Sequence, residues 1–286
     1  MKIRIGTRKS RLALVQTNMV IDELKSVFPD INIEVVTIST KGDRVIDKPL
    51  YNIGGKGVFV SEIEKMLESG DIDIAVHSGK DLPYRISGNL EIPGVLSRGD
   101  YRDALVTLKG KMPEKNSTFT VGTGSIRRAE FIKKLYPSVQ VIPVRGNVDT
   151  RLKKLKCGEF DGLILASAGI QRLETDCSEF DMKLFDYNEF LPAPCQGIIA
   201  VQTRKNSPES EIVQKISHKD TMLCFETERK VMEILGADCS VPLGVYSYIV
   251  NGYISLSVSL DGSRNICGKA MISDRIRLAE ELVKGL

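Results

Sequence analysis

The segment Asp71-Ile-Asp-Ile-Ala-Val-His-Ser-Gly-Lys-Asp-Leu-Pro83 joins a short apolar run to a polar turn. The run from Ile72 to Val76 is typical of a strand buried in a parallel sheet. Pro83 disfavours helix in the residue before it, so the polar turn is predicted to stay extended. Open α/β sheets hold their sites at the carboxyl ends of such strands. The segment therefore predicts an α/β fold with a site at Lys80 and Asp81, although two solvated loop charges would give the same pattern.

Composition indicates a globular chain with room for several domains. The chain has 286 residues, of which 42% are hydrophobic, and its formal net charge is +3. No apolar run approaches the roughly 18 residues that a membrane span needs. The first residues, Met-Lys-Ile-Arg-Ile-Gly, carry no long apolar signal region. We therefore expect a cytoplasmic protein with no membrane partner.

The cysteines and histidines predict no metal site. The two histidines and six cysteines are scattered, and no two cysteines form a Cys-x-x-Cys pair. Metal sites need such ligands at close spacing, whereas scattered cytosolic cysteines are most often reduced packing residues. The cysteines are Cys157, Cys177, Cys195, Cys224, Cys239 and Cys267.

Two halves of the chain repeat one order of elements. A strand, a Gly-Thr turn and a helix occur at Gly6-Thr7 and again at Gly122-Thr123. Further on, Leu67, Gly70 and Asp73 align with Leu155, Gly158 and Asp161. The repeat predicts two α/β domains that face each other across a cleft, a common way to enclose a small ligand.

The predicted boundaries follow from two crossings, at residues 98–101 and 191–197. Residues 1–97 and 196–214 form domain 1, residues 98–195 form domain 2, and residues 215–286 form a small α+β third domain with strong hairpin signals at Asn251-Gly252 and Asp261-Gly262. The glycine-rich segment 41–57 is predicted to be a mobile loop, long enough to act as a lid.

The run from Arg127 to Lys156 is strongly basic. Its nine basic and two acidic residues give a charge of +7, which leaves 3 − 7 = −4 for the rest of the chain. Four arginines are predicted at element ends on one sheet edge, where the planar guanidinium suits carboxylates or phosphates. Four lysines are predicted on helix exteriors as solvated charges. The arginines are Arg127, Arg128, Arg145 and Arg151, and the lysines are Lys133, Lys134, Lys153 and Lys154. An anionic partner is expected.

Cys239 lies three residues after a predicted helix end at Gly236. The partial negative charge of a helix C-terminus disfavours a thiolate, which argues against a protease-like nucleophile. Spacing alone favours a packed thiol, but it leaves open a cysteine that reacts once, as a covalent anchor.

Seven ordered motifs resemble those of the porphobilinogen deaminase family, nearly from end to end of the chain. They are Gly6-Thr-Arg-Lys-Ser10, Gly54-Gly-Lys-Gly-Val-Phe59, Ala75-Val-His-Ser-Gly-Lys-Asp-Leu-Pro83, Gly122-Thr-Gly-Ser-Ile-Arg-Arg128, Arg145-Gly-Asn-Val-Asp-Thr-Arg151, Leu191-Pro-Ala-Pro-Cys-Gln-Gly197 and Asp238-Cys-Ser-Val-Pro-Leu-Gly244. The resemblance implies two domains like those of type II periplasmic binding proteins, followed by a small third domain.

The resemblance also implies an activity. The enzyme would join four porphobilinogen molecules head to tail with loss of ammonia, on a dipyrromethane cofactor held by Cys239 through a thioether, and release hydroxymethylbilane. Asp81 would be the catalytic carboxylate. Cofactor binding would involve Cys239, Lys80, Thr123, Ser125, Arg127, Arg128, Arg145 and Gly146. Substrate binding would involve Arg8, Ser10, Lys56, Phe59, Ser78, Arg151, Arg172 and Gln196. We expect a monomer with no metal and no nucleic-acid partner.

Three positions depart from the family pattern: Gly79 stands where methionine is usual, Cys195 replaces a glycine, and Asp238 replaces the glycine before the anchor. Two other functions fit parts of the sequence. A non-catalytic two-lobed protein that binds a small polyanion would explain the arginines, but it has no use for a thioether. A nucleic-acid binder would explain the basic run, but aromatic residues are only 6% and tryptophan is absent, so stacking platforms are scarce.

Overall fold

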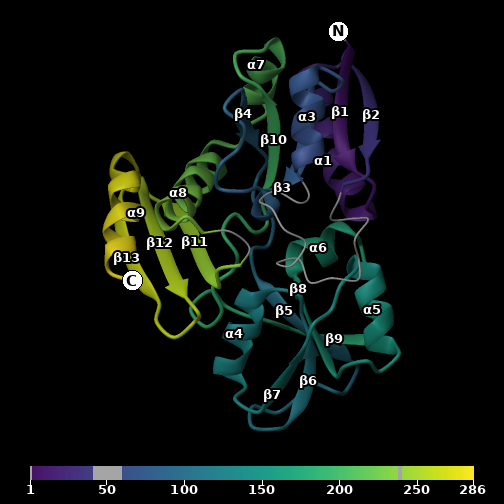
Figure 1. Ribbon diagram of the computed structural model, residues 1–286, viewed down its shortest axis with the longest axis vertical. Helices are drawn as coiled ribbons and strands as arrows, with labels where there is room; N and C mark the ends of the chain where they lie inside the picture. Colours follow the sequence, from purple (N-terminus) through teal and green to yellow (C-terminus); the bar gives the residue numbers. More distant parts are fainter. Residues whose placement is uncertain (1, 41–59, 238–239) are drawn as a thin grey trace.

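The computed structural model describes residues 2–40, 60–237 and 240–286, and in this part of the chain three sheets form three lobes (Figure 1). The first lobe consists of β1 (Lys2–Arg8), α1 (Arg11–Val27), β2 (Asn32–Ile38), α3 (Ser61–Ser69), β3 (Ile74–Ser78), the 3₁₀ turn η2 (Gly79–Asp81), β4 (Leu90–Val95), β10 (Ile199–Arg204) and α7 (Pro208–Lys215). Its sheet has the order β2-β1-β3-β10-β4. β1 runs parallel to β2 and β3, whereas β10 is antiparallel to both of its neighbours.

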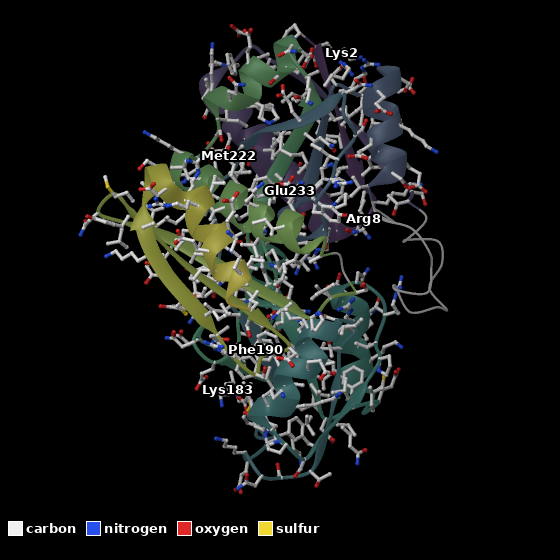
Figure 2. All side chains as sticks on the ribbon, turned by 60° about the vertical axis from the view of Figure 1, so that its left-hand side comes forward. Lys2, Arg8, Lys183, Phe190, Met222 and Glu233 are labelled. Carbon is white, nitrogen blue, oxygen red and sulfur yellow. The ribbon has the colours of Figure 1, made fainter. Side chains whose placement is uncertain are left out.

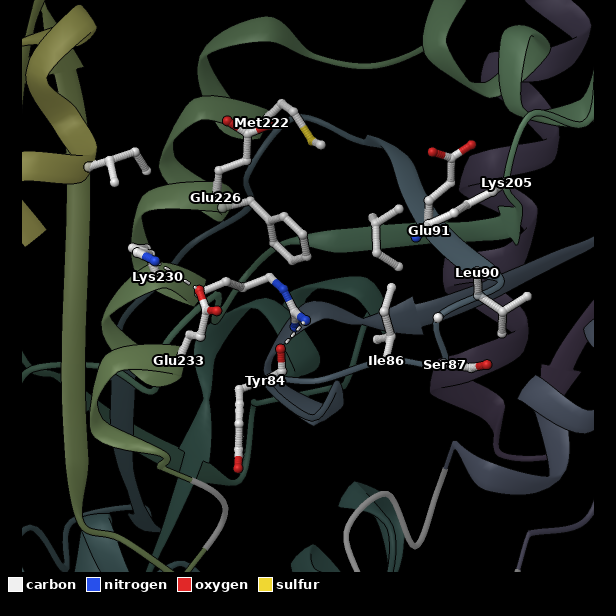
Figure 3. A pocket seen from close by; sticks show the side chains of 15 residues that line it. Tyr84, Ile86, Ser87, Leu90, Glu91, Lys205, Met222, Glu226, Lys230 and Glu233 are labelled. Carbon is white, nitrogen blue, oxygen red and sulfur yellow. Dashed lines mark hydrogen bonds and ion pairs between the residues drawn. The ribbon is translucent and has the colours of Figure 1, made fainter.

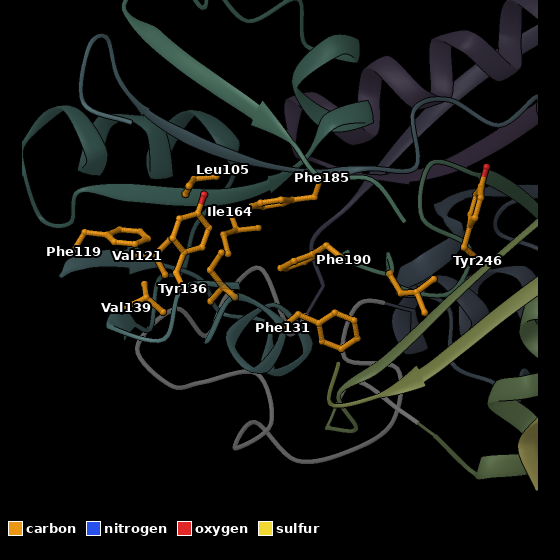
Figure 4. Packing of buried hydrophobic residues seen from close by; sticks show 12 residues of the cluster. Leu105, Phe119, Val121, Phe131, Tyr136, Val139, Ile164, Phe185, Phe190 and Tyr246 are labelled. Atoms are coloured by element: carbon orange, nitrogen blue, oxygen red, sulfur yellow. The ribbon is translucent and has the colours of Figure 1, made fainter. Parts of the chain in front are cut away.

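The second lobe has the same topology. It consists of β5 (Asp103–Leu108), β6 (Phe119–Gly122), α4 (Ile126–Leu135), β7 (Val139–Ile142), α5 (Val148–Lys156), β8 (Gly162–Ala166), α6 (Ser167–Arg172) and β9 (Phe180–Leu184). Its sheet order is β7-β6-β8-β5-β9, with β6 parallel to β7 and β8, and β5 antiparallel to β8 and β9. A buried cluster in which the rings of Phe185 and Phe190 stack supports this lobe (Figure 4).

The third lobe packs helices on one antiparallel sheet. It consists of α8 (Lys219–Leu235), β11 (Leu243–Val250), β12 (Tyr253–Leu260), β13 (Ile266–Met271), η3 (Ile272–Asp274) and α9 (Arg275–Lys284). The predicted turn residues Asn251 and Gly252 both have positive φ and connect β11 to β12, as two-residue hairpins require. Figure 1 shows this lobe beside the other two, with α8 on the side of the first lobe.

The predicted repeat holds at the level of single contacts. The Asp73 carboxylate accepts a hydrogen bond from the backbone N–H of Arg4 at 2.9 Å, and the Asp161 carboxylate accepts one from Thr120 at 2.7 Å. Each aspartate thus ties the start of a central strand to the neighbouring strand that carries the Gly-Thr turn. The glycines aligned in the two halves, Gly70 and Gly158, both follow a helix with φ near +75° (78° and 74°).

Gly158 gives a test of this shared architecture. Its left-handed backbone suits only glycine without strain, although a Cβ there would meet nothing within 4 Å. We expect Gly158→Ala to lower the free energy of unfolding by about 1 kcal/mol, measured by urea denaturation. Gly88→Ala is the matched control, because Gly88 also has open space but no positive φ. Equal effects of the two substitutions would contradict this explanation.

The opening segment forms its predicted strand, but the turn after it differs from the expectation. Gly79, Lys80 and Asp81 form one turn of 3₁₀ helix instead of an extended turn, and Leu82, before Pro83, returns to extended backbone with φ −74° and ψ 133°. The restriction by proline acts only on the residue before it, so it ends the helical turn without preventing it.

A buried ion pair holds the third lobe to the two crossings. The Arg98 guanidinium donates to both Glu228 carboxylate oxygens, at 2.6 and 3.3 Å, and its Nε donates to the carbonyl of Gln196 at 2.9 Å. Glu228 also accepts from the backbone N–H groups of Cys195 and Ser247, at 2.6 and 2.8 Å. Since the Glu228 side chain is fully buried, these donors replace water around its charge.

Candidate active site

The first two lobes present the carboxyl ends of their parallel strands to each other. Figure 2 shows Arg8, at the end of β1, on the side of the first lobe that faces the second. Contacts cross between the lobes here: the Arg11 guanidinium reaches the Asp149 carboxylate at 3.5 Å and donates to the carbonyl of Leu173 at 3.0 Å. Arg8, one of the predicted site residues, therefore lies where the first two lobes meet.

The 3₁₀ turn after β3 carries Lys80 and Asp81 into this region. The N–H of Gly79 donates to the carbonyl of Ile198 at 2.8 Å, and the N–H of Leu82 donates to the carbonyl of Gly79 at 3.2 Å. Leu82 is buried, so the turn is fixed at both of its ends. Both charged side chains are half-buried, and their separate roles stay a prediction.

Lys80 lies among charged groups of both signs, two arginines and two aspartates. Burial, and then the charge of Arg128, lowers the pKa of its ammonium group to about 8, while Asp81 and Asp103 act in the opposite direction. Its Nζ lies 3.4 Å from the side-chain oxygen of Gln196. An ammonium group held among like charges is stabilised by any anion that enters, so Lys80 is suited to bind a carboxylate.

Sequence reasoning missed Asp103, the buried centre of the arginine cluster. Its carboxylate accepts from the Arg127 guanidinium at 2.7 Å and from the Arg128 guanidinium at 2.7 and 3.0 Å. Burial alone would raise the pKa of Asp103, but the charges of Arg127, Arg128 and Lys80 outweigh it and hold that pKa at about 2. A signal was present in the sequence, because Asp103 opens an otherwise apolar strand, where a charge needs a partner.

Asp103 changes the interpretation of the two adjacent arginines. Arg127 also donates to the carbonyl of Leu191 at 2.6 Å, and Arg128 to that of Ile164 at 3.1 Å. Both guanidinium groups are thus turned inward and hold protein groups, and neither is more than 8% exposed. Their predicted contacts with a cofactor stay a prediction.

Arg145, Gly146 and Arg151 lie close together at the start of α5. The Nε of Arg151 donates to the carbonyl of Gly146 at 2.8 Å, and Gly146 has a φ of 111° that favours glycine. Burial, followed by the charges of Arg128 and Arg145, lowers the pKa of Arg151 to about 10, while Asp81 raises it. Asp81 of the first lobe therefore acts electrostatically on an arginine of the second.

Gln196 connects the charged groups of the two lobes. Its amide nitrogen donates to the carbonyl of Tyr101 at 2.7 Å and to Asp103 at 3.1 Å, while its oxygen faces Lys80 and Arg128, the latter at 3.5 Å. Next to it, the carbonyl of Gly197 accepts from the Arg172 guanidinium at 2.6 Å. Burial lowers the pKa of Arg172 to about 10.

The predicted hydroxyl residues mostly cap or brace helices. Ser10 caps α1 by accepting from the N–H of Ala13 at 3.3 Å, and Ser125 caps α4 by accepting from the N–H of Arg128 at 3.4 Å. Thr123 accepts from the N–H of Ser125 at 3.2 Å. The Ser78 hydroxyl pairs with the side-chain amide of Gln16 on α1, at 2.9 and 3.0 Å. These contacts orient the helix starts that face the cleft.

Three of the predicted site residues, Lys56, Phe59 and Cys239, lie outside the described residues, as does the glycine-rich segment 41–57. The lysines of the basic run behave as expected, and three of its lysines pair with glutamates: Lys133 with Glu130, Lys154 with Glu159, and Lys156 with Glu179. The basic run thus separates into two buried arginines, Arg127 and Arg128, two partly buried ones, Arg145 and Arg151, and lysines nearer the surface.

A cavity of about 450 Å³ lies away from this cleft, between the loop 84–92 and α8 (Figure 3). It contains none of the predicted site residues; one of its walls is Arg229, which donates to the carbonyl of Tyr84 at 3.0 Å. Elsewhere in the described part of the chain, no group of histidine, cysteine, aspartate and glutamate could hold a metal ion, and no helix is long and apolar enough to cross a membrane.

Two family profiles match this chain, and both describe porphobilinogen deaminase. A family profile described as "Porphobilinogen deaminase, dipyromethane cofactor binding domain" matches residues 3–212, and one described as "Porphobilinogen deaminase, C-terminal domain" matches residues 222–286. The porphobilinogen deaminase of Rickettsia typhi is 46% identical over 253 residues, which are 88% of this chain and 84% of that protein. That of Rickettsia bellii is 44% identical over 268 residues, 92% of this chain and 89% of that protein.

Solved structures with a similar arrangement include the periplasmic aliphatic sulphonate binding protein SsuA from Escherichia coli. It is 12% identical, the match covers 82% of this chain and 70% of that chain, and the TM-score is 0.45. A similarity this low says nothing about which ligand this chain binds.

Proposed function

Since the chain belongs to the porphobilinogen deaminase family, we propose that the cleft between its first two lobes is the active site and that Asp81 is the catalytic carboxylate. The observation that carries this proposal is the fixed 3₁₀ turn, which presents Asp81 and Lys80 towards the arginines of the second lobe.

The chain is a transferase that joins four porphobilinogen molecules head to tail, with loss of ammonia, on a covalent dipyrromethane cofactor, and then releases the linear tetrapyrrole hydroxymethylbilane by hydrolysis. A non-catalytic binding protein is not favoured, because the relatives that match over most of the chain are deaminases.

The residues of the cleft fit a dipyrromethane. This group, made from two porphobilinogen units, carries several carboxylates. The cleft holds Lys80, Arg151 and Arg172, whose pKa values are lowered by burial, and neighbouring arginines lower those of Lys80 and Arg151 further. Lys80 and Arg145 would bind its carboxylates, and Cys239 would anchor it. When bound, the dipyrromethane supplies the pyrrole α-carbon to which substrate units are added.

Asp81 has the position and charge to act on the substrate. As ammonia leaves porphobilinogen, positive charge develops on the pyrrole, and a carboxylate that accepts a hydrogen bond from the pyrrole N–H stabilises that charge. The half-buried site strengthens this interaction relative to water. We assign the carboxylates of substrate and growing chain to Arg8, Arg151 and Arg172.

The lowered pKa of Lys80 predicts that substrate capture depends on pH. Its pKa of about 8 means that the free enzyme loses this positive charge as the pH rises through that value, so kcat/KM for porphobilinogen should fall above pH 8. Lys80→Arg, which stays protonated in this range, should move the fall to higher pH. An unchanged profile in Lys80→Arg would show that another group controls it.

The three sheets also support a division of the chain into three domains. We propose that residues 1–97 with 196–214, residues 98–195 and residues 215–286 are the three domains, in agreement with the three sheets. We further propose that the chain acts as a cytoplasmic monomer; neither point is needed for the assignment of the site.

Mass spectrometry of the intact protein tests the function. We expect an adduct of the mass of a dipyrromethane, absent from Cys239→Ser and retained in Cys157→Ser and Cys267→Ser, which change the two cysteines that are exposed in the described part of the chain. The protein should also convert porphobilinogen to hydroxymethylbilane, measured by absorbance after cyclisation and oxidation. An unmodified protein without turnover would overturn the assignment.

A further inference from the structure

Three consecutive residues of the second crossing contact three different parts of the molecule. The N–H of Cys195 donates to Glu228 of α8 at 2.6 Å. The side chain of Gln196 reaches the cleft, and the carbonyl of Gly197 accepts from Arg172 of the second lobe. A shift of this segment would therefore change contacts with all three lobes.

Cys195 holds an unusual conformation in this segment. Its φ of 59° lies in the left-handed region, which a residue with a Cβ rarely adopts, and its side chain is fully buried. The side chain packs in one cluster with Leu82 of the turn region and Phe225 of α8. Such a conformation persists only where several contacts hold it, and here the cluster and the bond to Glu228 do so.

Gly79, the first residue of the turn that carries Lys80 and Asp81, lies directly against Cys195. A Cβ added at Gly79 would lie 3.2 Å from the Cβ of Cys195, 3.2 Å from its carbonyl oxygen and 3.3 Å from the carbonyl oxygen of Ile198. These distances are tighter than ordinary van der Waals contact. Any side chain at position 79 would therefore displace either the crossing or the turn that bears the catalytic carboxylate.

We propose that Gly79 and Cys195 form a coupled positioning pair, in which the Cβ of Cys195 occupies the space that a side chain at position 79 would need and so sets where the catalytic turn lies. This inference deepens the proposed function and rests on the role of Asp81 in it. The pair acts through steric and backbone contacts, and the thiol takes part in no reaction.

A double-mutant cycle tests the pair. Gly79→Ala alone should lower kcat about tenfold, because displacements of a few tenths of an ångström at a reacting group already matter. Cys195→Gly alone should stay within about threefold of the unmodified protein, since glycine suits a φ of 59°. The double variant should recover at least part of the kcat that Gly79→Ala loses, because the Cβ contact is gone, although the carbonyl oxygens of Cys195 and Ile198 stay close to position 79. Effects that simply multiply would overturn the proposal.

Two controls separate the Cβ from other causes. Cys195→Ala keeps the Cβ and removes the sulfur, so it should be as active as the unmodified protein and should not rescue Gly79→Ala. Gly88→Ala adds a Cβ in the same lobe at a place where nothing lies within 4 Å, so it should leave kcat unchanged. Rescue by Cys195→Ala would assign the contact to the sulfur and overturn the role of the Cβ.

A second readout distinguishes positioning from mere loss of stability. The fall of kcat/KM with pH, assigned to Lys80, should shift in Gly79→Ala and return in the double variant, whereas a purely structural effect would change only the melting temperature. If Gly79→Ala alone does not fold, the double variant should fold, and its failure to do so would contradict the pair. A rate in Asp81→Asn within threefold of the unmodified enzyme would overturn the proposed role of Asp81, whereas a strongly impaired Asp81→Asn beside a fully active Gly79→Ala would overturn only the pair.

Discussion

Asp81→Asn should lower kcat for porphobilinogen by about 10²–10⁴-fold while the protein stays folded. Asparagine keeps the size of the side chain but removes the negative charge that stabilises the pyrrole as ammonia leaves. The measurement is the steady-state rate of product formation, together with the melting temperature, which should change little because Asp81 is half-buried and lies in no described ion pair.

Two matched variants define what is lost. Asp71→Asn changes an exposed acid just before the same strand and should leave kcat unchanged. Asp81→Glu keeps the charge and moves it by one methylene, so its activity should lie between those of Asp81→Asn and the unmodified protein. A rate in Asp81→Asn within threefold of the unmodified enzyme would remove Asp81 from the mechanism.

Asp103→Asn should lower the free energy of unfolding by about 3–5 kcal/mol at neutral pH, because it leaves the buried guanidinium groups of Arg127 and Arg128 without their counter-ion. The native pKa of Asp103, about 2, lies below the value of an unfolded aspartate, so its contribution is complete at neutral pH and is lost as the pH falls towards 2. Urea denaturation at pH 7 measures the effect.

The control for Asp103 lies on the exposed side of the helix that bears the two arginines. Glu130→Gln removes the partner of Lys133 in an exposed ion pair, and it should cost less than about 1 kcal/mol. Asp103→Asn should also move the fall of kcat/KM to lower pH, since Asp103 raises the pKa of Lys80. A loss of stability no larger than that of Glu130→Gln would show that the arginines find other compensation.

Local patterns were sufficient to predict the two lobes and the strand before Lys80 and Asp81, but not the 3₁₀ conformation of the turn that carries them. The repeated strand, Gly-Thr turn and helix depend on periodicity and turn residues within about ten positions, and the aligned residues Asp73 and Asp161 make the same contact in both lobes. Elements with weaker local signals were not predicted, among them β4, β5, β9, α6 and α7. The fold class was nevertheless correct, because the buried parallel strands have the strongest pattern.

The partners of the charged residues could not be predicted in the same way. Sequence spacing grouped Arg127 and Arg128 with the cleft arginines, whereas the structure turns both of them to Asp103, 24 and 25 residues away. Glu228 meets Arg98 across 130 residues. Such pairs form because a buried charge must find a counter-ion somewhere in the fold, and no local pattern specifies which one.

The sequence by itself determined that this chain has two similar α/β lobes and a small third one, that it belongs with the deaminases, and that Asp81 follows a buried strand. These properties depend on local periodicity and on ordered motifs. Only the tertiary structure decided what surrounds Asp81. Gly79 and Cys195 are far apart in the sequence, yet they lie in direct contact in the fold. The physical reason is close packing, which couples residues by distance in space, whatever their separation along the chain.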